Sequence, residues 1–357
     1  MQTLWERGRL DGVLSRVPLT VRRRVHWGDT DTAQIGYTSK FVDFALEAVE
    51  YWWESVLDLD WYALNVGRNL GVPLGGMRFD FNAPVIAGER LDLTVRVDSI
   101  GRSSLTLKVE GTKADGRNSF TAELTEVLID RATMKPVPLP EDWRRRIEGY
   151  EREVALQARG VRTADEVIDF WFGPPGSAER GTHRPRWFRK DDGVDPDRFD
   201  ADCRDGFHAT YEAAAAGELD HWLDSIDGAL ALLVLLDQMP RNMFRGTARA
   251  YDTDAKALAS AKLAIERGHD RAVPLAMRLF FYLPFEHSEV LADQERAVEL
   301  FQAAFEGSER GPRAMESARR HHEIVARFGR FPHRNQILGR ESTPEEIAFL
   351  KEPNSSF

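Results

Sequence analysis

The stretch HWGDTDTAQIGYTSKF, residues 26–41, places two aspartates one residue apart between two different hydrophobic patterns. Before it, apolar and polar residues alternate from Leu19 to Trp27, which predicts a half-buried strand. After it, apolar residues return every three or four positions as far as Val56, which predicts a helix of roughly four to five turns that starts near Ser39. An acidic pair at such a junction either forms a turn and caps the helix or performs chemistry.

Strand patterns follow the predicted helix and are separated by hairpin turns. The expected strands are 77–83, 90–100, 104–112 and 120–130. In the last of them the apolar phase slips between Leu124 and Val127, which predicts a β-bulge. One long helix followed by an antiparallel meander is an α+β pattern in which the sheet wraps around the helix.

Composition limits the class of protein. A length of 357 residues favours two domains, and a formal charge of −10 argues against nucleic acid as a partner. There is no run of about 18 apolar residues, so no membrane-spanning helix and no membrane partner are expected. The beginning of the sequence mixes both charge signs and has no apolar core, so no signal peptide is expected. The single cysteine, Cys203, fits a reducing compartment, so the predicted location is the cytoplasm.

The second half of the chain has no alternating strand pattern. Helical patterns occur at 228–239, 252–267, 289–305, 313–328 and 343–351. The second half is therefore predicted to be all-α. The expected division is a first domain at 17–145, a linker helix at 146–162 and an all-helical domain at 163–357.

Four segments of the first half, taken together, resemble a known family. They are residues 25–53 (VHWGDTDTAQIGYTSKFVDFALEAVEYWW), 81–93 (FNAPVIAGERLDL), 98–107 (DSIGRSSLTL) and 127–140 (VLIDRATMKPVPLP). In this order they resemble the hotdog-fold acyl-CoA thioesterases of the 4-hydroxybenzoyl-CoA thioesterase type. The resemblance implies an α+β hotdog fold, a small acyl- or aryl-CoA thioester as substrate, and no cofactor apart from the coenzyme A of the substrate. It also implies sites formed between subunits, and hence a homodimer or tetramer.

The same resemblance assigns roles to the opening motif. The family's catalytic carboxylate corresponds to Asp31, as nucleophile or general base, and backbone amides near Tyr37 and Thr38 would hold the oxyanion. From spacing alone, a turn and a cap would be favoured for both aspartates. The flanking matches reverse this for Asp31 and leave Asp29 as a structural residue.

Other positions depart from the family or add to it. Gln34 and Gly36 stand where the family commonly has glycine and a β-branched residue. Gln34 is expected to place an amide near the substrate, and Gly36 to loosen the approach to the helix. Arg102 and Ser103 lie in the hairpin where related enzymes hold coenzyme A phosphates, although a solvent-exposed turn arginine is the other interpretation.

The second half resembles an uncharacterised family of all-helical bacterial proteins with a tetratricopeptide-like arrangement. Three polar stretches carry this resemblance: 235–254, 280–301 and 319–346. It implies a fold but no activity. The charged residues in these stretches form either a salt-bridge network or a pocket for a small anion or acidic metabolite. The pocket candidates are Arg241, Glu286, His287, Arg330, His333 and Arg334. No metal-binding spacing occurs, so no metal is expected.

Three functional hypotheses follow. The first is a cytoplasmic acyl-CoA thioesterase fused to a helical domain. The second is a protein that binds an acyl-CoA or acyl carrier without hydrolysis. In the third, the helical domain has its own small-anion-binding activity and the hotdog half serves as a dimerisation scaffold.

Overall fold

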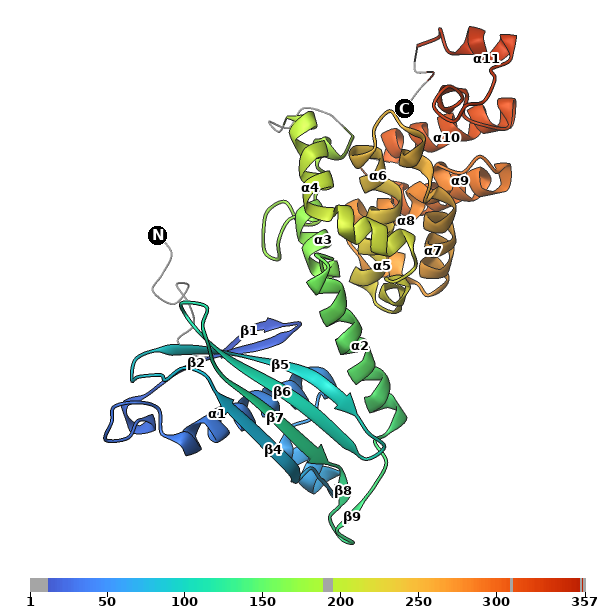
Figure 1. Cartoon of the computed structure of the whole chain (residues 1–357). Coiled ribbons are helices and arrows are strands. Elements are labelled where there is room, and N and C mark those ends of the chain that lie inside the picture. Colours follow the sequence, from blue (N-terminus) through green and yellow to red (C-terminus); the bar gives the residue numbers. More distant parts are fainter. Residues whose placement is uncertain (1–11, 189–194, 309–310, 354, 356–357) are drawn as a thin grey trace. The chain divides into compact units, whose positions relative to one another are not determined.

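The alternating apolar pattern of the first half builds a six-stranded antiparallel sheet (Figure 1). The computed structural model describes residues 12–188, 195–308, 311–353 and 355. The strand order of the sheet is β1-β2-β5-β6-β7-β4. The strands are β1 (Gly12–Arg16), β2 (Leu19–Arg24), β4 (Leu74–Phe81), β5 (Arg90–Ile100), β6 (Ser104–Lys113) and β7 (Asn118–Val127). A small second sheet joins β3 (Leu70–Gly71), β8 (Ile129–Asp130) and β9 (Lys135–Pro136).

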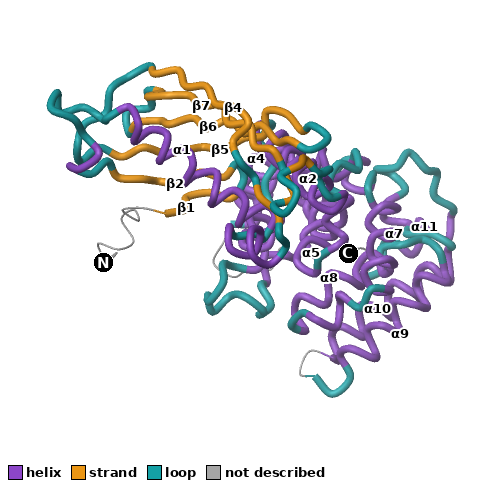
Figure 2. Tube along the Cα trace, turned by 90° about the horizontal axis from the view of Figure 1, so that it is seen from below, coloured by secondary structure: helices purple, strands orange, loops and turns teal. Residues whose placement is uncertain are grey.

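The long helix α1 (Thr38–Trp52) packs against β2, β5 and β6 (Figure 2). Its apolar face is buried from Phe41 to Trp52, at the three- and four-residue spacing that the sequence shows. The helix continues as a π-helical turn, η2 (Trp53–Leu57), and a second one, η3 (Ala63–Gly67), precedes β3. The predicted helix wrapped by an antiparallel sheet is confirmed.

The bulge predicted in the last long strand is wrong. β7 pairs with β6 without a shift from Phe120 to Val127, and its side chains alternate regularly between the two faces of the sheet. The apolar phase slips because Glu126, a carboxylic acid, occupies a core-facing position and is only 3% exposed. The irregularity lies in the neighbouring strand instead, between Leu74 and Gly76 of β4.

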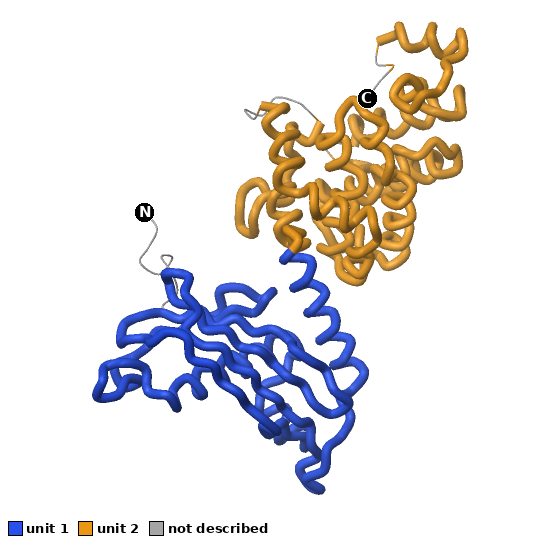
Figure 3. The backbone as a smooth tube through the Cα atoms, in the orientation of Figure 1, with its two compact units in different colours: residues 1–158 blue, residues 159–357 orange. Residues whose placement is uncertain are grey.

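The helix expected as a linker belongs to the first unit. It is α2 (Glu141–Ala158), so the boundary expected after residue 145 falls inside a helix. The Tyr150 hydroxyl accepts a hydrogen bond from the Leu19 amide at 2.9 Å and donates to the Val95 carbonyl at 2.7 Å. The chain divides into Met1–Ala158 and Arg159–Phe357 (Figure 3).

The second unit is helical, as predicted. Its α-helices are α3 (Ala164–Phe172), α4 (Pro196–Ala215), α5 (Ile226–Leu233), α6 (Met239–Met243), α7 (Asp254–Glu266), α8 (Leu275–Glu286), α9 (Leu291–Phe305), α10 (Gly311–Phe328) and α11 (Pro344–Phe349). Short 3-10 segments connect them: η4 (Pro185–Phe188), η5 (Asp220–Asp224), η7 (Ala248–Tyr251), η8 (His269–Ala272) and η9 (Pro332–Arg334).

The apolar run predicted as one central helix at 228–239 is completely buried but not uniform. A π-helical segment, η6 (Val234–Gln238), separates α5 from α6. None of the helices in the described part of the chain combines the length and apolar content needed to cross a bilayer.

Candidate functional site

The loop between β2 and α1 is closed by backbone hydrogen bonds around Asp29. The Tyr37 amide donates to the Asp29 carbonyl at 2.8 Å, and Thr30 and Gly36 form an antiparallel bridge. The Asp29 side chain is buried, and its Oδ2 accepts from the His26 amide at 2.8 Å. Asp29 therefore holds the loop together, the structural role that was predicted for it.

Asp31 lies at the exposed tip of this loop. Its Oδ1 accepts from the Ala33 amide at 2.8 Å, and its own amide donates to the Ile35 carbonyl at 3.0 Å. Asp31 thus forms the turn that the structural interpretation requires. Its Oδ2, however, makes no hydrogen bond to any residue that the structure describes. One oxygen orients the carboxylate, and the other remains open to solvent.

The N-terminus of α1 follows directly and has no side-chain cap. The Tyr37 amide, predicted as an oxyanion donor, is already bonded to the Asp29 carbonyl, so that part of the prediction is wrong. The amides of Thr38 and Ser39 have no acceptor among the described residues. Two free N–H groups and the positive end of the helix dipole make this terminus suited to a developing negative charge.

Gly36 and Gln34 are both tightly constrained. A Cβ atom on Gly36 would lie 2.8 Å from Cγ2 of Val85 and 3.0 Å from the ring of Phe41. Gly36 thus permits close packing of the loop on the core, so the prediction that it loosens the approach is wrong. Gln34 has a φ of 62°, a left-handed conformation that glycine adopts without strain.

Arg102 and Ser103 lie at the other end of the sheet from Asp31 within one chain. They form the turn between β5 and β6, whereas the Asp31 loop packs beside residues 85–89, just before β5 begins. The eleven residues of β5 separate the two places by roughly 35 Å. Their carbonyls accept hydrogen bonds from Leu139 and Leu128, so both residues also fix the chain after β7.

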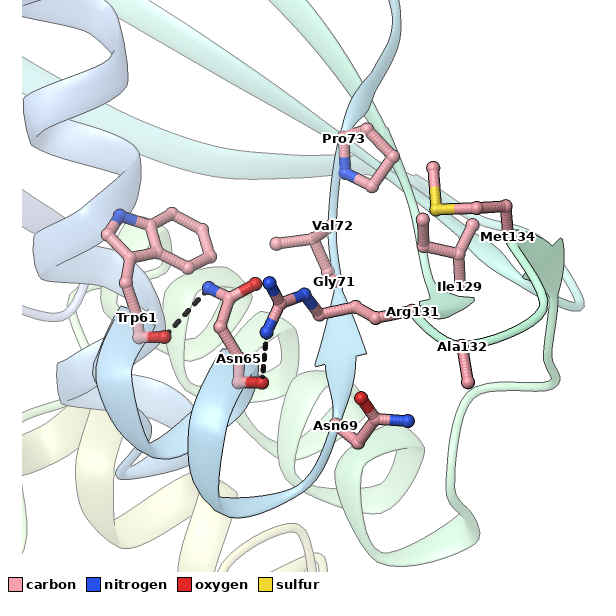
Figure 4. A pocket seen from close by; sticks show the side chains of 10 residues that line it. All are labelled: Trp61, Asn65, Asn69, Gly71, Val72, Pro73, Ile129, Arg131, Ala132 and Met134. Atoms are coloured by element: carbon pink, nitrogen blue, oxygen red, sulfur yellow. Dashed lines mark hydrogen bonds between the residues drawn. The ribbon is translucent and has the colours of Figure 1, made fainter.

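An open pocket of about 670 Å³ lies beside η3, β3 and the turn between β8 and β9 (Figure 4). Its lining consists of Trp61, Asn65, Asn69, Gly71, Val72, Pro73, Ile129, Arg131, Ala132 and Met134. Arg131 donates to the Asn65 carbonyl at 2.6 Å, and Asn65 Nδ2 donates to the Trp61 carbonyl at 2.7 Å. The pocket adjoins the beginning of β4, whereas the Asp31 loop lies beyond its end, so within one chain it is not part of the Asp31 site.

The second-unit candidates separate into two groups. Arg241, His287 and Arg334 lie around Asp237 and Asp254, two aspartates that were not among the predicted pocket residues. Arg241 binds both oxygens of Asp254 at 3.0 and 3.1 Å, and Arg334 binds the same carboxylate at 3.3 Å. His287 Nδ1 lies 2.7 Å from Oδ1 of Asp237. The sequence placed both aspartates in a polar stretch, but no local spacing connects Asp254 with Arg334.

The remaining candidates lie beside this cluster or away from it. Glu286 accepts from the Ser317 hydroxyl at 2.6 Å and lies 2.9 Å from His321 Nδ1. Arg330 is paired with Glu346 through two hydrogen bonds of 2.7 and 2.8 Å, an ion pair that holds α11. Burial, with help from Arg334, lowers the pKa of His333 to about 4, so this histidine is neutral at pH 7. Across the described residues, no three histidine, cysteine or carboxylate side chains gather in the geometry of a metal site.

Two protein families match the two units. Residues 167–354, more than half of the chain, match the family of bacterial proteins of unknown function DUF924, and residues 25–147 match the thioesterase-like superfamily. A 1,4-dihydroxy-2-naphthoyl-CoA hydrolase from Synechocystis is 29% identical over 126 residues, which are 35% of this chain and 90% of that protein.

Two solved structures align with one unit each. A protein of unknown function from Agrobacterium tumefaciens is 45% identical, with a TM-score of 0.45, over 53% of this chain and 96% of that one. A thioesterase-superfamily protein from Jannaschia is 34% identical, with a TM-score of 0.35, over 36% of this chain and 90% of that one. From the family matches, the chain belongs to the DUF924 family of bacterial proteins of unknown function and carries, ahead of that domain, a hotdog domain of the thioesterase-like superfamily.

Proposed function

We propose that the first unit hydrolyses the thioester of a small acyl- or aryl-CoA, with Asp31 as nucleophile or general base. The observation that carries this proposal is the open Oδ2 of Asp31, in a loop tied directly to the uncapped N-terminus of α1. The similarity of this unit to a hydrolase named for a CoA thioester supports a CoA thioester as the class of substrate.

The proposed chemistry uses groups that have no hydrogen-bond partner among the described residues. The thioester carbonyl oxygen would accept from the amides of Thr38 and Ser39, which stabilise the negative charge that develops on it. As a nucleophile, Asp31 would form an anhydride and expel the coenzyme A thiolate, and water would then hydrolyse the anhydride. As a general base, Asp31 would instead take a proton from the attacking water.

A homodimer or tetramer is part of the proposal. The edge strand β4 exposes Met77 (56%) and Phe81 (51%), and an exposed apolar edge favours pairing with another strand. In an antiparallel pair of β4 strands, the sheet end that carries Arg102 and Ser103 in one copy would approach the Asp31 end of the other. Those two residues would then bind coenzyme A phosphates across the subunits.

The test compares thiol release from a panel of acyl- and aryl-CoA esters by wild type and Asp31→Asn. Asparagine keeps an acceptor for the Ala33 amide, so the turn is preserved while the reactive carboxylate is lost. We expect turnover to fall by about 10²–10⁴, the usual effect of losing a positioned acid or base. Asp43→Asn is the control, because Asp43 is an exposed carboxylate in α1, the helix that follows the Asp31 loop, and it pairs with Lys40.

Full activity of Asp31→Asn would overturn the assignment. If the wild type binds CoA esters saturably but releases no thiol, the first unit is a binding protein instead. Label in the Asp31 carboxylate after a single turnover in ¹⁸O-labelled water would establish the nucleophilic route. Water that attacks the anhydride at the Asp31 carbon leaves its oxygen there, whereas general-base catalysis leaves it only in the released acid.

A further inference from the structure

Charged side chains from four separate segments of the second unit meet at one place. They come from the η6–α6 junction, the start of α7, the end of α8, and η9, and they are Asp237, Arg241, Asp254, His287 and Arg334. The side chains of Arg241, Asp254 and His287 are 20%, 19% and 14% exposed, so the cluster reaches solvent on one side. None of these residues belongs to the Asp31 site.

Asp237 and His287 form a carboxylate–imidazole pair within the cluster. Burial raises the pKa of Asp237, but His287 and Arg241 outweigh it, so the pKa is lowered overall. Burial, followed by the charge of Arg241, lowers the pKa of His287 despite its bond to Asp237. At neutral pH an ionised Asp237 therefore holds the Nδ1 proton of a neutral imidazole, and Nε2 is left as an acceptor.

Arg241 and Arg334 converge on the single carboxylate of Asp254. Arg241 binds it through both terminal nitrogens, and Arg334 adds one bond of 3.3 Å to Oδ2. The guanidinium of Arg334 lies 4.7 Å from the centre of the Tyr251 ring and 4.5 Å from that of Phe331. Two planar cations that already share a carboxylate have the geometry that recognises a small oxyanion.

Two polar atoms in this region lack the partners that a closed salt-bridge network would supply. The Nε of Arg334, whose side chain is 8% exposed, is a buried donor without an acceptor among the described residues. The Oε2 of Glu286, which is 2% exposed, is a buried acceptor without a donor in the same part of the chain. Such unmatched buried groups are rare and call for an explanation, such as a bound ligand.

The two unmatched atoms lie in adjoining parts of the unit. The rings of His287 and His321 are 6.2 Å apart, and His321 binds Glu286 at 2.9 Å. Arg334 donates to the His287 carbonyl at 3.1 Å. The unmatched donor of Arg334 suits the anionic group of a ligand, and the unmatched acceptor of Glu286 is a second incomplete polar contact in the residue next to His287.

We propose that the second unit binds a small hydroxylated oxyanion, whose anionic group contacts Arg241 and Arg334 beside Asp254 and whose hydroxyl donates to Nε2 of His287. The shared chemistry is that of a hydroxy-carboxylate or a phosphate monoester. In the free protein, Asp254 accepts hydrogen bonds from the same two guanidinium groups. The ligand therefore binds beside Asp254 or displaces it from them.

Isothermal titration of the full chain with L-malate and with glycerol 3-phosphate distinguishes the two sources of the anion. Succinate and inorganic phosphate are the matched probes, because they lack the hydroxyl group on carbon that L-malate and glycerol 3-phosphate carry. We expect one hydroxylated probe to bind and its matched probe to bind at least tenfold more weakly. Absence of binding by both L-malate and glycerol 3-phosphate would overturn the proposal.

Arginine variants then locate the site. Arg334→Lys keeps the charge but loses the planar donor set, so we expect binding to weaken at least tenfold. Arg330→Lys alters an arginine four residues away that is paired with Glu346 outside the cluster, and it should change affinity less than twofold. Equal affinity of Arg334→Lys and wild type would exclude this site.

A measurement on the wild type keeps the proposal testable if the variants fold poorly. The His287 ring signals can be followed by NMR across pH, with assignment from His287→Gln. The charged or titratable groups packed around this ring are Asp237, Arg241, Asp254, Glu286, His321 and Arg334. An added negative charge beside the imidazole should move its titration midpoint to higher pH, whereas an unchanged midpoint with saturating probe would contradict the proposal.

Discussion

The carboxyl group of Glu126 accepts a hydrogen bond of 2.7 Å from the indole nitrogen of Trp53, inside the core of the hotdog domain. Burial raises the pKa of Glu126 to about 7, although the bond from Trp53 acts in the opposite direction. An unfolded glutamate ionises near pH 4.3. Between these two pH values the folded state keeps a proton that the unfolded state has lost. The free energy of unfolding should therefore fall by about 3 kcal/mol as pH rises from about 4.5 to 7.

Glu126→Gln should remove this pH dependence. The amide oxygen still accepts from Trp53 but does not titrate, so the stability of the variant relative to wild type should increase from pH 5 to pH 7. Urea unfolding of the full chain at several pH values measures the difference. Glu123→Gln is the control, because Glu123 lies on the opposite face of β7. The same pH slope for wild type and Glu126→Gln would contradict the prediction.

Glu126 also explains why the bulge that the sequence predicted in β7 is absent. Hydrophobic periodicity assumes that core positions are apolar, and a buried carboxylic acid breaks that assumption. The partner that makes its burial tolerable, Trp53, is 73 residues away and leaves no local signal. By contrast, β5 has the bounds that were predicted, because its core-facing residues from Leu91 to Val95 are all apolar.

The two candidate sites also differ in how far the sequence could predict them. The Asp31 loop could be predicted because its parts, from Asp29 to Thr38, are contiguous in sequence and lie between a strand pattern and a helix pattern. For the second-unit cluster, the sequence could predict which charged residues are present but not which of them pair with one another. Asp254 binds one arginine 13 residues before it and another 80 residues after it, and periodicity carries no information about such pairs.

Gly36→Ala should disturb the Asp31 loop. The new methyl group would lie within 3.0 Å of both Val85 and Phe41, which are buried and cannot easily move. We expect a loss of about 1–3 kcal/mol in the free energy of unfolding, together with reduced thioester hydrolysis. Gly28→Ala is the matched control, since a Cβ there meets no atom within 4 Å. Equal losses in the two variants would show that the close packing of Gly36 is not the cause.

Arg102→Gln should weaken binding of the coenzyme A part of the substrate without slowing the chemical step. If the guanidinium binds a coenzyme A phosphate, KM for the CoA ester should rise about tenfold with little change in kcat. The corresponding pantetheine ester lacks the nucleotide phosphates, so its KM should not change. Arg117→Gln, which alters an exposed arginine in the hairpin between β6 and β7, is the control. A similar loss on both esters would argue against phosphate binding.

Gln34 allows backbone strain and substrate contact to be measured separately. Gln34 has a φ of 62°. Its replacement by glycine should raise the free energy of unfolding by about 1 kcal/mol, because glycine has no Cβ to strain. Gln34→Ala keeps the Cβ and hence the strain and removes the side chain beyond Cβ, including the amide, so its stability should stay close to that of wild type. If the amide contacts the substrate, both variants should raise KM for the preferred CoA ester equally. Thermal or urea unfolding that shows the same stability for glycine and alanine would contradict the strained conformation.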